Sequence, residues 1–99
     1  MEHRHGKRKP TDMETLLYRH GLPVALGRTV NIGPGGAFVR FTNSMLIDDY
    51  SLEVEFIATE DGCNRKYHTD ALVVHRSPSG IGIMFDSHDR NIIVSVQFT

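Results

Sequence analysis

Short apolar segments separated by turn residues constrain this sequence more than any other feature. The clearest segment runs from Ser51 to Thr59, where Leu52, Val54 and Phe56 alternate with polar residues. This period of two predicts a strand with one buried side and one side in contact with water. We expect five further strands, at residues 13–18, 24–32, 37–41, 67–76 and 81–85.

Turn residues close each of these segments, and the densest cluster runs from Gly33 to Gly36 after the second one. Gly27 lies inside that second segment and predicts a weakened strand or a bulge there. Six short strands in a chain of 99 residues indicate an antiparallel β-sandwich or a small β-barrel. A closed barrel is favoured because closure leaves no strand edge exposed.

The stretch from Ser87 to Thr99 gives two conflicting signals. Ser87 can cap a helix and Asp89 suits a first helical turn. Apolar residues at positions 92, 94, 96 and 98 alternate instead, and three of these four are β-branched. The local pattern therefore favours a strand over most of this stretch.

The net charge of −1 conceals an uneven distribution. Residues 1–10 contain four of the chain's 11 basic residues but only one of its 12 acidic residues, Glu2. Residues 11–99 therefore contain 7 basic and 11 acidic residues, which gives them a net charge of −4. An acidic body without tryptophan lacks the broad basic face and aromatic platforms of DNA- or RNA-binding domains, so we expect no nucleic-acid partner. No apolar residue lies between Glu2 and Pro10. We therefore expect a flexible basic arm at 1–10 and one domain at 11–99.

The single cysteine, Cys63, excludes an intrachain disulfide and favours a reducing, cytoplasmic compartment. No apolar run reaches the roughly 20 residues of a membrane span, and the charged N-terminus lacks the apolar core of a secretory signal. His3 and His5 have no third ligand nearby, so we expect no metal or other cofactor. His68 and His75 have no nucleophile or paired carboxylate at a useful spacing, so we expect no enzyme.

Two short motifs carry the functional signal. Arg4 and Arg8 lie four residues apart, and two guanidinium groups can hold a phosphate or a guanine edge. Asn31, Gly33 and Gly36 follow as NxGxxG at the end of a strand, where glycines permit positive φ and close backbone approach. An apolar strand follows instead of a helix, which excludes a Rossmann phosphate loop. Alone, each motif is compatible with a solvated tail or a plain hairpin turn.

In this order the two motifs resemble the PilZ domain family, whose pattern is RxxxR followed by Asp/Asn-x-Ser/Ala-x-x-Gly. Residues 71–76 (ALVVHR) and 80–85 (GIGIMF) look like the last two strands of that family, so the resemblance extends from Arg4 to about Asp86. It implies an all-β fold, a six-stranded antiparallel β-barrel of PilZ type, usually followed by a C-terminal helix. That implication favours a short helix at 87–91 over the strand that the local pattern favours.

The resemblance also implies that the chain binds cyclic di-GMP, a bacterial second messenger, and is not an enzyme. Arg4 and Arg8 would grip guanine edges and phosphate, Asn31 would bond a guanine, and Gly36 would permit the backbone turn. The arm would become ordered on the ligand, and a downstream protein partner would detect the change.

One position departs from the family pattern, because Gly33 stands where the family has Ser or Ala. We expect this change to weaken or retune binding of the nucleotide, not to abolish it. The alternative is a PilZ-like protein-interaction module that binds no nucleotide. Arg28 and Arg40 flank the second motif, and they either add phosphate contacts or pair with acidic neighbours.

Overall fold

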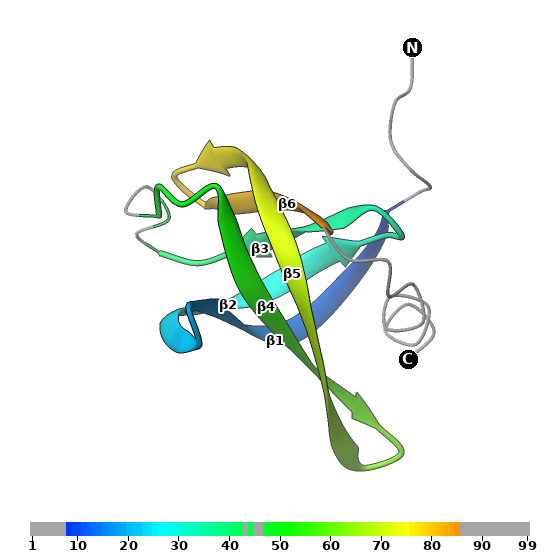
Figure 1. Ribbon diagram of the computed structural model, residues 1–99. Coiled ribbons are helices and arrows are strands. Elements are labelled where there is room, and N and C mark those ends of the chain that lie inside the picture. Colours follow the sequence, from blue (N-terminus) through cyan, green and yellow to red (C-terminus); the bar gives the residue numbers. More distant parts are fainter. Residues whose placement is uncertain (1–7, 43, 45–46, 86–99) are drawn as a thin grey trace.

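A computed structural model describes residues 8–42, 44 and 47–85, and all six expected segments form strands in it (Figure 1). The strands are β1 (Lys9–Arg19), β2 (Leu22–Ile32), β3 (Gly36–Arg40), β4 (Ser51–Glu60), β5 (Cys63–Ser77) and β6 (Gly80–Phe85). The described residues contain no helix that is both long and apolar enough to cross a membrane. The expected helix at 87–91, the competing strand near the C-terminus, and Arg4, His3 and His5 lie outside the described residues.

The strands form one closed barrel in the order β1-β2-β3-β6-β5-β4, and every neighbouring pair is antiparallel. This confirms the expected six-stranded antiparallel barrel. Two tight turns are formed by His20-Gly21 and Asp61-Gly62. In each turn the first residue has a φ of 52° and the glycine has a φ of 79°. Two successive positive φ angles match the right-handed twist of the strands that a two-residue hairpin connects. These local turns therefore set the register of β1 with β2 and of β4 with β5.

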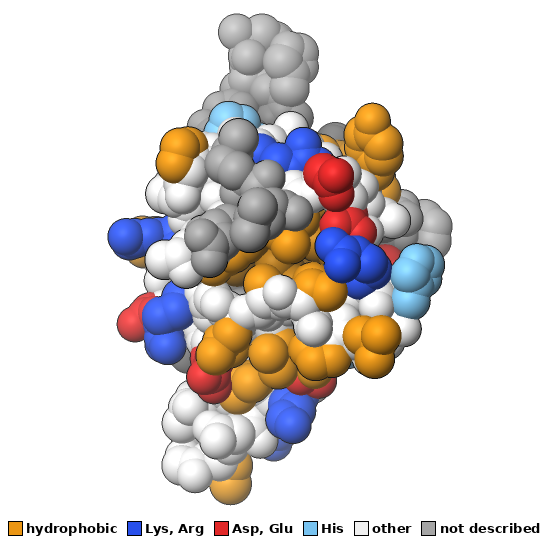
Figure 2. All heavy atoms as spheres, turned by 90° about the vertical axis from the view of Figure 1, so that its left-hand side faces the viewer, with side chains coloured by type: hydrophobic (Ala, Val, Ile, Leu, Met, Phe, Trp, Pro, Cys, Tyr) orange, Lys and Arg blue, Asp and Glu red, His pale blue; other side chains and the backbone are white. Residues whose placement is uncertain are grey.

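The barrel interior is filled by the side chains that the alternation in β4 predicts. Leu52, Val54 and Phe56 are all buried. Two threonines are buried beside the apolar core, with a distance of 2.7 Å between the hydroxyl oxygens of Thr15 and Thr29. Figure 2 shows the face of the molecule that lies on the left in Figure 1. Hydrophobic side chains lie in the middle of this face, and charged side chains surround them. The other core side chains belong to Met13, Leu17, Ile32, Ala37, Val39, Ile47, Ala58, Ala71, Ile81 and Ile83.

Strand β1 begins earlier than its apolar pattern indicates. Lys9 pairs with Ile32 and Pro10 pairs with Asn31, so the last two residues of the expected arm are strand residues. Neither residue is apolar and buried, so no period-two pattern marks them. The ladder of β2 continues past the hydrophobic part of β1 and supplies backbone partners for these two residues.

The expected bulge in β2 lies elsewhere in the strand. The register of β2 with β3 shifts between Thr29 and Asn31, and its register with β1 shifts between Ala25 and Pro23, whereas Gly27 pairs regularly with Thr15. The bulge prediction at Gly27 is therefore wrong in position. Gly27 has a different role, because a Cβ there would lie 2.4 Å from the backbone oxygen of Arg40. Only a residue without a side chain fits at this close approach of β2 to the end of β3.

Candidate functional site

The two sequence motifs meet at one end of the barrel. Lys9 pairs with Ile32, so the antiparallel register brings Arg8 beside Gly33 at the start of the β2–β3 loop. Figure 1 shows the beginning of β1 next to the β2–β3 hairpin on the right of the view. Arg8 is half-buried there. The structure thus brings together one arginine of the first motif and the glycine loop of the second.

The β2–β3 loop is held by backbone hydrogen bonds. The N–H of Gly33 donates to the carbonyl oxygen of Gly36 at 2.9 Å. The N–H of Phe85, at the end of β6, donates to the carbonyl oxygen of Gly35 at 3.0 Å. Gly33 needs no side-chain hydroxyl for the first of these bonds. The loop is therefore tied both to itself and to the end of β6, which gives it a defined shape without a serine or alanine.

Gly36 is required for a reason other than the expected one. Within the described residues, Gly21 and Gly62 are the only glycines with positive φ, so this loop does not use the positive φ that its glycines permit. A Cβ on Gly36 would instead lie 2.1 Å from the backbone oxygen of Ile83. Gly36 is needed because β3 and β6 approach closely where it pairs with Met84.

Asn31 holds the most unusual polar atom of the site. The residue is half-exposed, but its Oδ1 is buried and accepts no hydrogen bond. In the part of the chain that the structure describes, no other buried side-chain oxygen or nitrogen lacks a partner. Buried polar atoms in folded proteins nearly always have a partner, so a lone acceptor needs an explanation. Here the barrel leaves an acceptor free for a donor from outside the described residues.

The outer face of β2 and β3 extends the site beyond the two motifs. Asn31 pairs with Phe38, and Arg40 lies two residues further along β3 on the same outward side, because the intervening Val39 is buried. Phe38 is absent from the expected site residues, although alternation in this segment already indicates its outward direction. This face therefore offers an amide acceptor, an aromatic ring and a cation in a row.

The two flanking arginines differ in their contacts. The Nε of Arg28 lies 2.5 Å from Oδ1 of Asp12, so Arg28 pairs with an acidic neighbour. Arg40 is exposed, and among the described residues it forms no ion pair. Both line a cavity of about 630 Å³ that Val30, the neighbour of Asn31, also lines. Of the two arginines, Arg40 is thus the one available to an anion.

Comparison with known proteins identifies the fold. No family model and no curated protein matches the chain. The PilZ domain of CeSA from a cellulose-synthesizing bacterium has a TM-score of 0.65 at 16% identity, covering 92% of this chain and 91% of that chain. The chain has a PilZ-type fold. This confirms the fold that the resemblance implies for the sequence.

A second solved structure has the same fold within a longer protein. The Bacillus subtilis inhibitor of motility MotI/DgrA has a TM-score of 0.73 at 16% identity, and the match covers 99% of this chain. The chain spans about half the length of that protein, as the match covers 50% of it. Among the described residues of this PilZ-type domain, no group of three His, Cys, Asp or Glu side chains is placed to hold a metal ion.

Proposed function

We propose that this PilZ-type domain is a bacterial, cytoplasmic receptor for cyclic di-GMP that binds the nucleotide without chemical conversion. The lone Oδ1 of Asn31 is the observation that carries the proposal. A guanine base presents an amino group and a ring N–H, so it can donate to a single acceptor. Asn31 would thus complete its hydrogen bonding only when the base is bound.

The cations around Asn31 suit the two phosphodiesters of the same ligand. Arg8 lies beside Gly33, on one side of Asn31. Arg40 lies on the other side of Asn31, on the outer face of β3. Guanidinium groups hold phosphate oxygens through paired, charge-assisted hydrogen bonds. We assign Arg8, and Arg4 from the arm, to the guanine edges and phosphate, and Arg40 to a further phosphate contact.

Gly33 supports weakened binding rather than lost binding in this proposal. The family position holds Ser or Ala, and Gly33 provides neither a hydroxyl nor a methyl group. Its backbone N–H nevertheless closes the loop onto Gly36. Ordering of the arm over the ligand would then change the surface that a downstream protein partner reads.

Isothermal titration with cyclic di-GMP tests the proposal, with cyclic di-AMP as the matched control. Adenine lacks the ring N–H and the 2-amino group through which guanine would donate to Asn31, and its own amino group lies at position 6, where guanine has an oxygen. We expect cyclic di-GMP to bind about 5- to 150-fold more tightly, because one missing hydrogen bond to a buried group costs roughly 1–3 kcal/mol. No heat and no shift in melting temperature at millimolar cyclic di-GMP would favour the nucleotide-independent interaction module instead.

Replacing Asn31 with leucine should separate ligand binding from stability. The free protein keeps a buried acceptor without a partner, so the Asn31→Leu substitution should raise the free energy of unfolding by about 1 kcal/mol. The same substitution should weaken binding of cyclic di-GMP by roughly tenfold or more. Urea denaturation and calorimetry measure the two effects. A loss of stability on substitution would mean that Asn31 already has a partner in the free protein.

A further inference from the structure

The outer face of β1, β4 and β5 carries a group of carboxylates away from the β2–β3 loop. Tyr18 pairs with Glu53, and Glu53 pairs with Asp70 across the three strands. In the next row, Glu55 pairs with His68. We name these five residues the acidic face. They point outward, because the residues that alternate with them, such as Val54 and Phe56, are buried in the core.

Contacts within the acidic face leave its negative charge largely unneutralised. The hydroxyl of Tyr18 donates to Glu55 Oε1 at 3.0 Å, and this bond raises the pKa of Tyr18. The Nε2 of His68 lies 3.4 Å from Glu53 Oε1, and the ring centroids of His68 and Tyr18 are 5.6 Å apart. The carboxylate of Asp70 pairs with no cation among the described residues. Three carboxylates therefore face one histidine.

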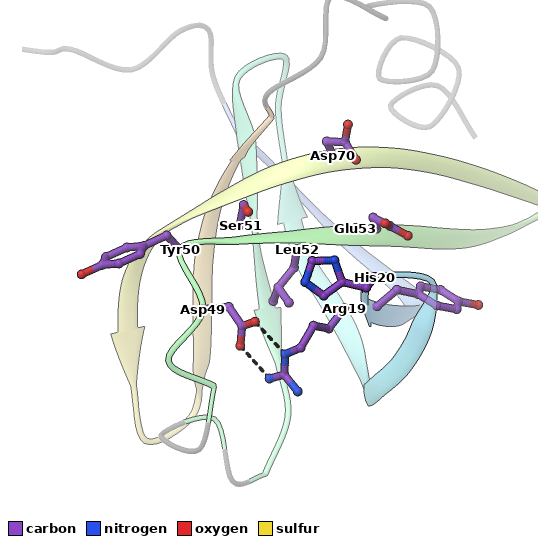
Figure 3. A pocket seen from close by; sticks show the side chains of 9 residues that line it. Arg19, His20, Asp49, Tyr50, Ser51, Leu52, Glu53 and Asp70 are labelled. Atoms are coloured by element: carbon purple, nitrogen blue, oxygen red, sulfur yellow. Dashed lines mark hydrogen bonds and ion pairs between the residues drawn. The ribbon is translucent and has the colours of Figure 1, made fainter.

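A pocket of about 470 Å³ opens where the acidic face meets the loop before β4 (Figure 3). Tyr18, Glu53 and Asp70 line it. The one arginine in its lining is already engaged, since Arg19 donates to both carboxylate oxygens of Asp49, at 2.7 and 2.6 Å. That pairing lowers the pKa of Asp49. The negative charge left in the pocket therefore comes from Glu53 and Asp70, and His20 is the one other basic side chain in the lining.

Exposed apolar and aromatic side chains border the same carboxylates. Leu16 lies between Leu26 of β2 and Glu55 of β4 in the register, and Leu26 is 60% exposed. Tyr50, at the rim of the pocket, is 85% exposed. Carboxylates beside exposed leucine and tyrosine side chains combine charge selectivity with apolar contact area, a combination found at protein–protein interfaces.

We propose that the acidic face docks a basic, arginine-containing segment of a partner protein. Carboxylates accept paired hydrogen bonds from guanidinium groups, and tyrosine rings attract cations. The methylene stems of arginine side chains can cover Leu16 and Leu26. Of the neighbouring cations, Arg19 is bound to Asp49 and Arg28 to Asp12. Lys66 lies two residues before His68 on β5 and leaves the three carboxylates in excess.

The position of the acidic face allows it to act together with the nucleotide site. Tyr18 follows Arg8 by ten residues along β1, a distance of about 33 Å in extended chain. A basic segment on β1, β4 and β5 would therefore leave the β2–β3 loop accessible. The proposal does not depend on cyclic di-GMP, since nothing in the acidic face belongs to the nucleotide site.

Titration of the ¹⁵N-labelled full chain with a synthetic octapeptide of alternating arginine and leucine tests the proposal. We expect chemical-shift changes concentrated at residues 14–18, 53–57 and 66–70. A peptide with glutamate in place of arginine should cause none of these changes. Shifts scattered over the barrel, or no binding at millimolar peptide, would overturn the proposal.

A pair of charge-neutralising variants separates a specific surface from a general effect of net charge. Glu53→Gln with Asp70→Asn removes two charges from the acidic face, and should weaken peptide binding by about tenfold or more. Glu60→Gln with Asp61→Asn removes two charges at the turn between β4 and β5 and should leave the affinity within about twofold. Unchanged melting temperatures would show that both variants are folded. Equal weakening by both variants would mean that only net charge matters, and would contradict the proposal.

Discussion

Replacing Arg8 with alanine is expected to weaken binding of cyclic di-GMP by about 10- to 150-fold. Arg8 is half-buried beside Gly33, where the register of β1 with β2 places it next to the loop that contains the second motif. Hydrogen bonds from a charged group contribute roughly 1.5–3 kcal/mol, which corresponds to that range of affinity. Isothermal titration at one fixed salt concentration measures the change, because phosphate contacts depend on salt.

Two matched variants show whether the effect of Arg8 is specific. Lys66→Ala removes the same charge from β5, away from the loop, and should leave the affinity nearly unchanged. Arg8→Lys keeps the charge but loses the paired geometry of the guanidinium group, so an intermediate affinity is expected. If Arg8→Ala binds cyclic di-GMP as tightly as the unmodified chain, Arg8 does not contact the nucleotide.

Replacing Gly36 with alanine is expected to cost about 3 kcal/mol of stability, at the upper end for overpacking. The added Cβ would meet backbone atoms, at 2.1 Å from the oxygen and 3.2 Å from the carbon of Ile83. Backbone cannot rotate away as a side chain can, so the β3–β6 ladder must open where Gly36 pairs with Met84. The melting temperature should fall by roughly 12–24 °C for a domain of this size.

Gly82→Ala provides the control for this prediction within the same pair of strands. The nearest atom to its added Cβ is the Cβ of His75, at 3.3 Å, and the second is a side-chain atom of Val74 at 4.0 Å. The Cβ of His75 would have to give way by only a few tenths of an ångström, and the distance to Val74 is an ordinary van der Waals contact. We expect Gly82→Ala to cost about 1 kcal/mol or less. Equal melting temperatures for the two variants would contradict the steric reason given for Gly36.

The strands were predictable from the sequence because each has a buried side that alternates with a solvated one. Leu52, Val54 and Phe56 show this pattern and are buried as it predicts. The start of β1 was not predictable in this way, since Lys9 and Pro10 are held by the ladder of β2 rather than by burial of their side chains. Local sequence carries no signal for a partner strand that lies over 20 residues away.

The candidate site also has features that the sequence predicts and features that depend on the folded barrel. Asn31, Gly33, Gly36 and Arg8 were identifiable as motif residues, and the PilZ-type fold that their pattern implied is confirmed. The reason for Gly36 was not identifiable, because the carbonyl of Ile83 comes close only when β6 is in place. The lone acceptor of Asn31 likewise exists only because the folded barrel excludes water from it and supplies no donor.

The sequence by itself thus determined the number of strands, the inward side of β4 and the residue types of the two motifs. Tertiary structure decided which of those residues meet, which glycines are needed against backbone, and which carboxylates share the acidic face. The physical reason is register: side chains alternate with a period of two, so a slip of one residue would exchange the inner and outer sides of a strand. That register is set jointly by turns, bulges and closure of the barrel, which link strands that are far apart along the chain.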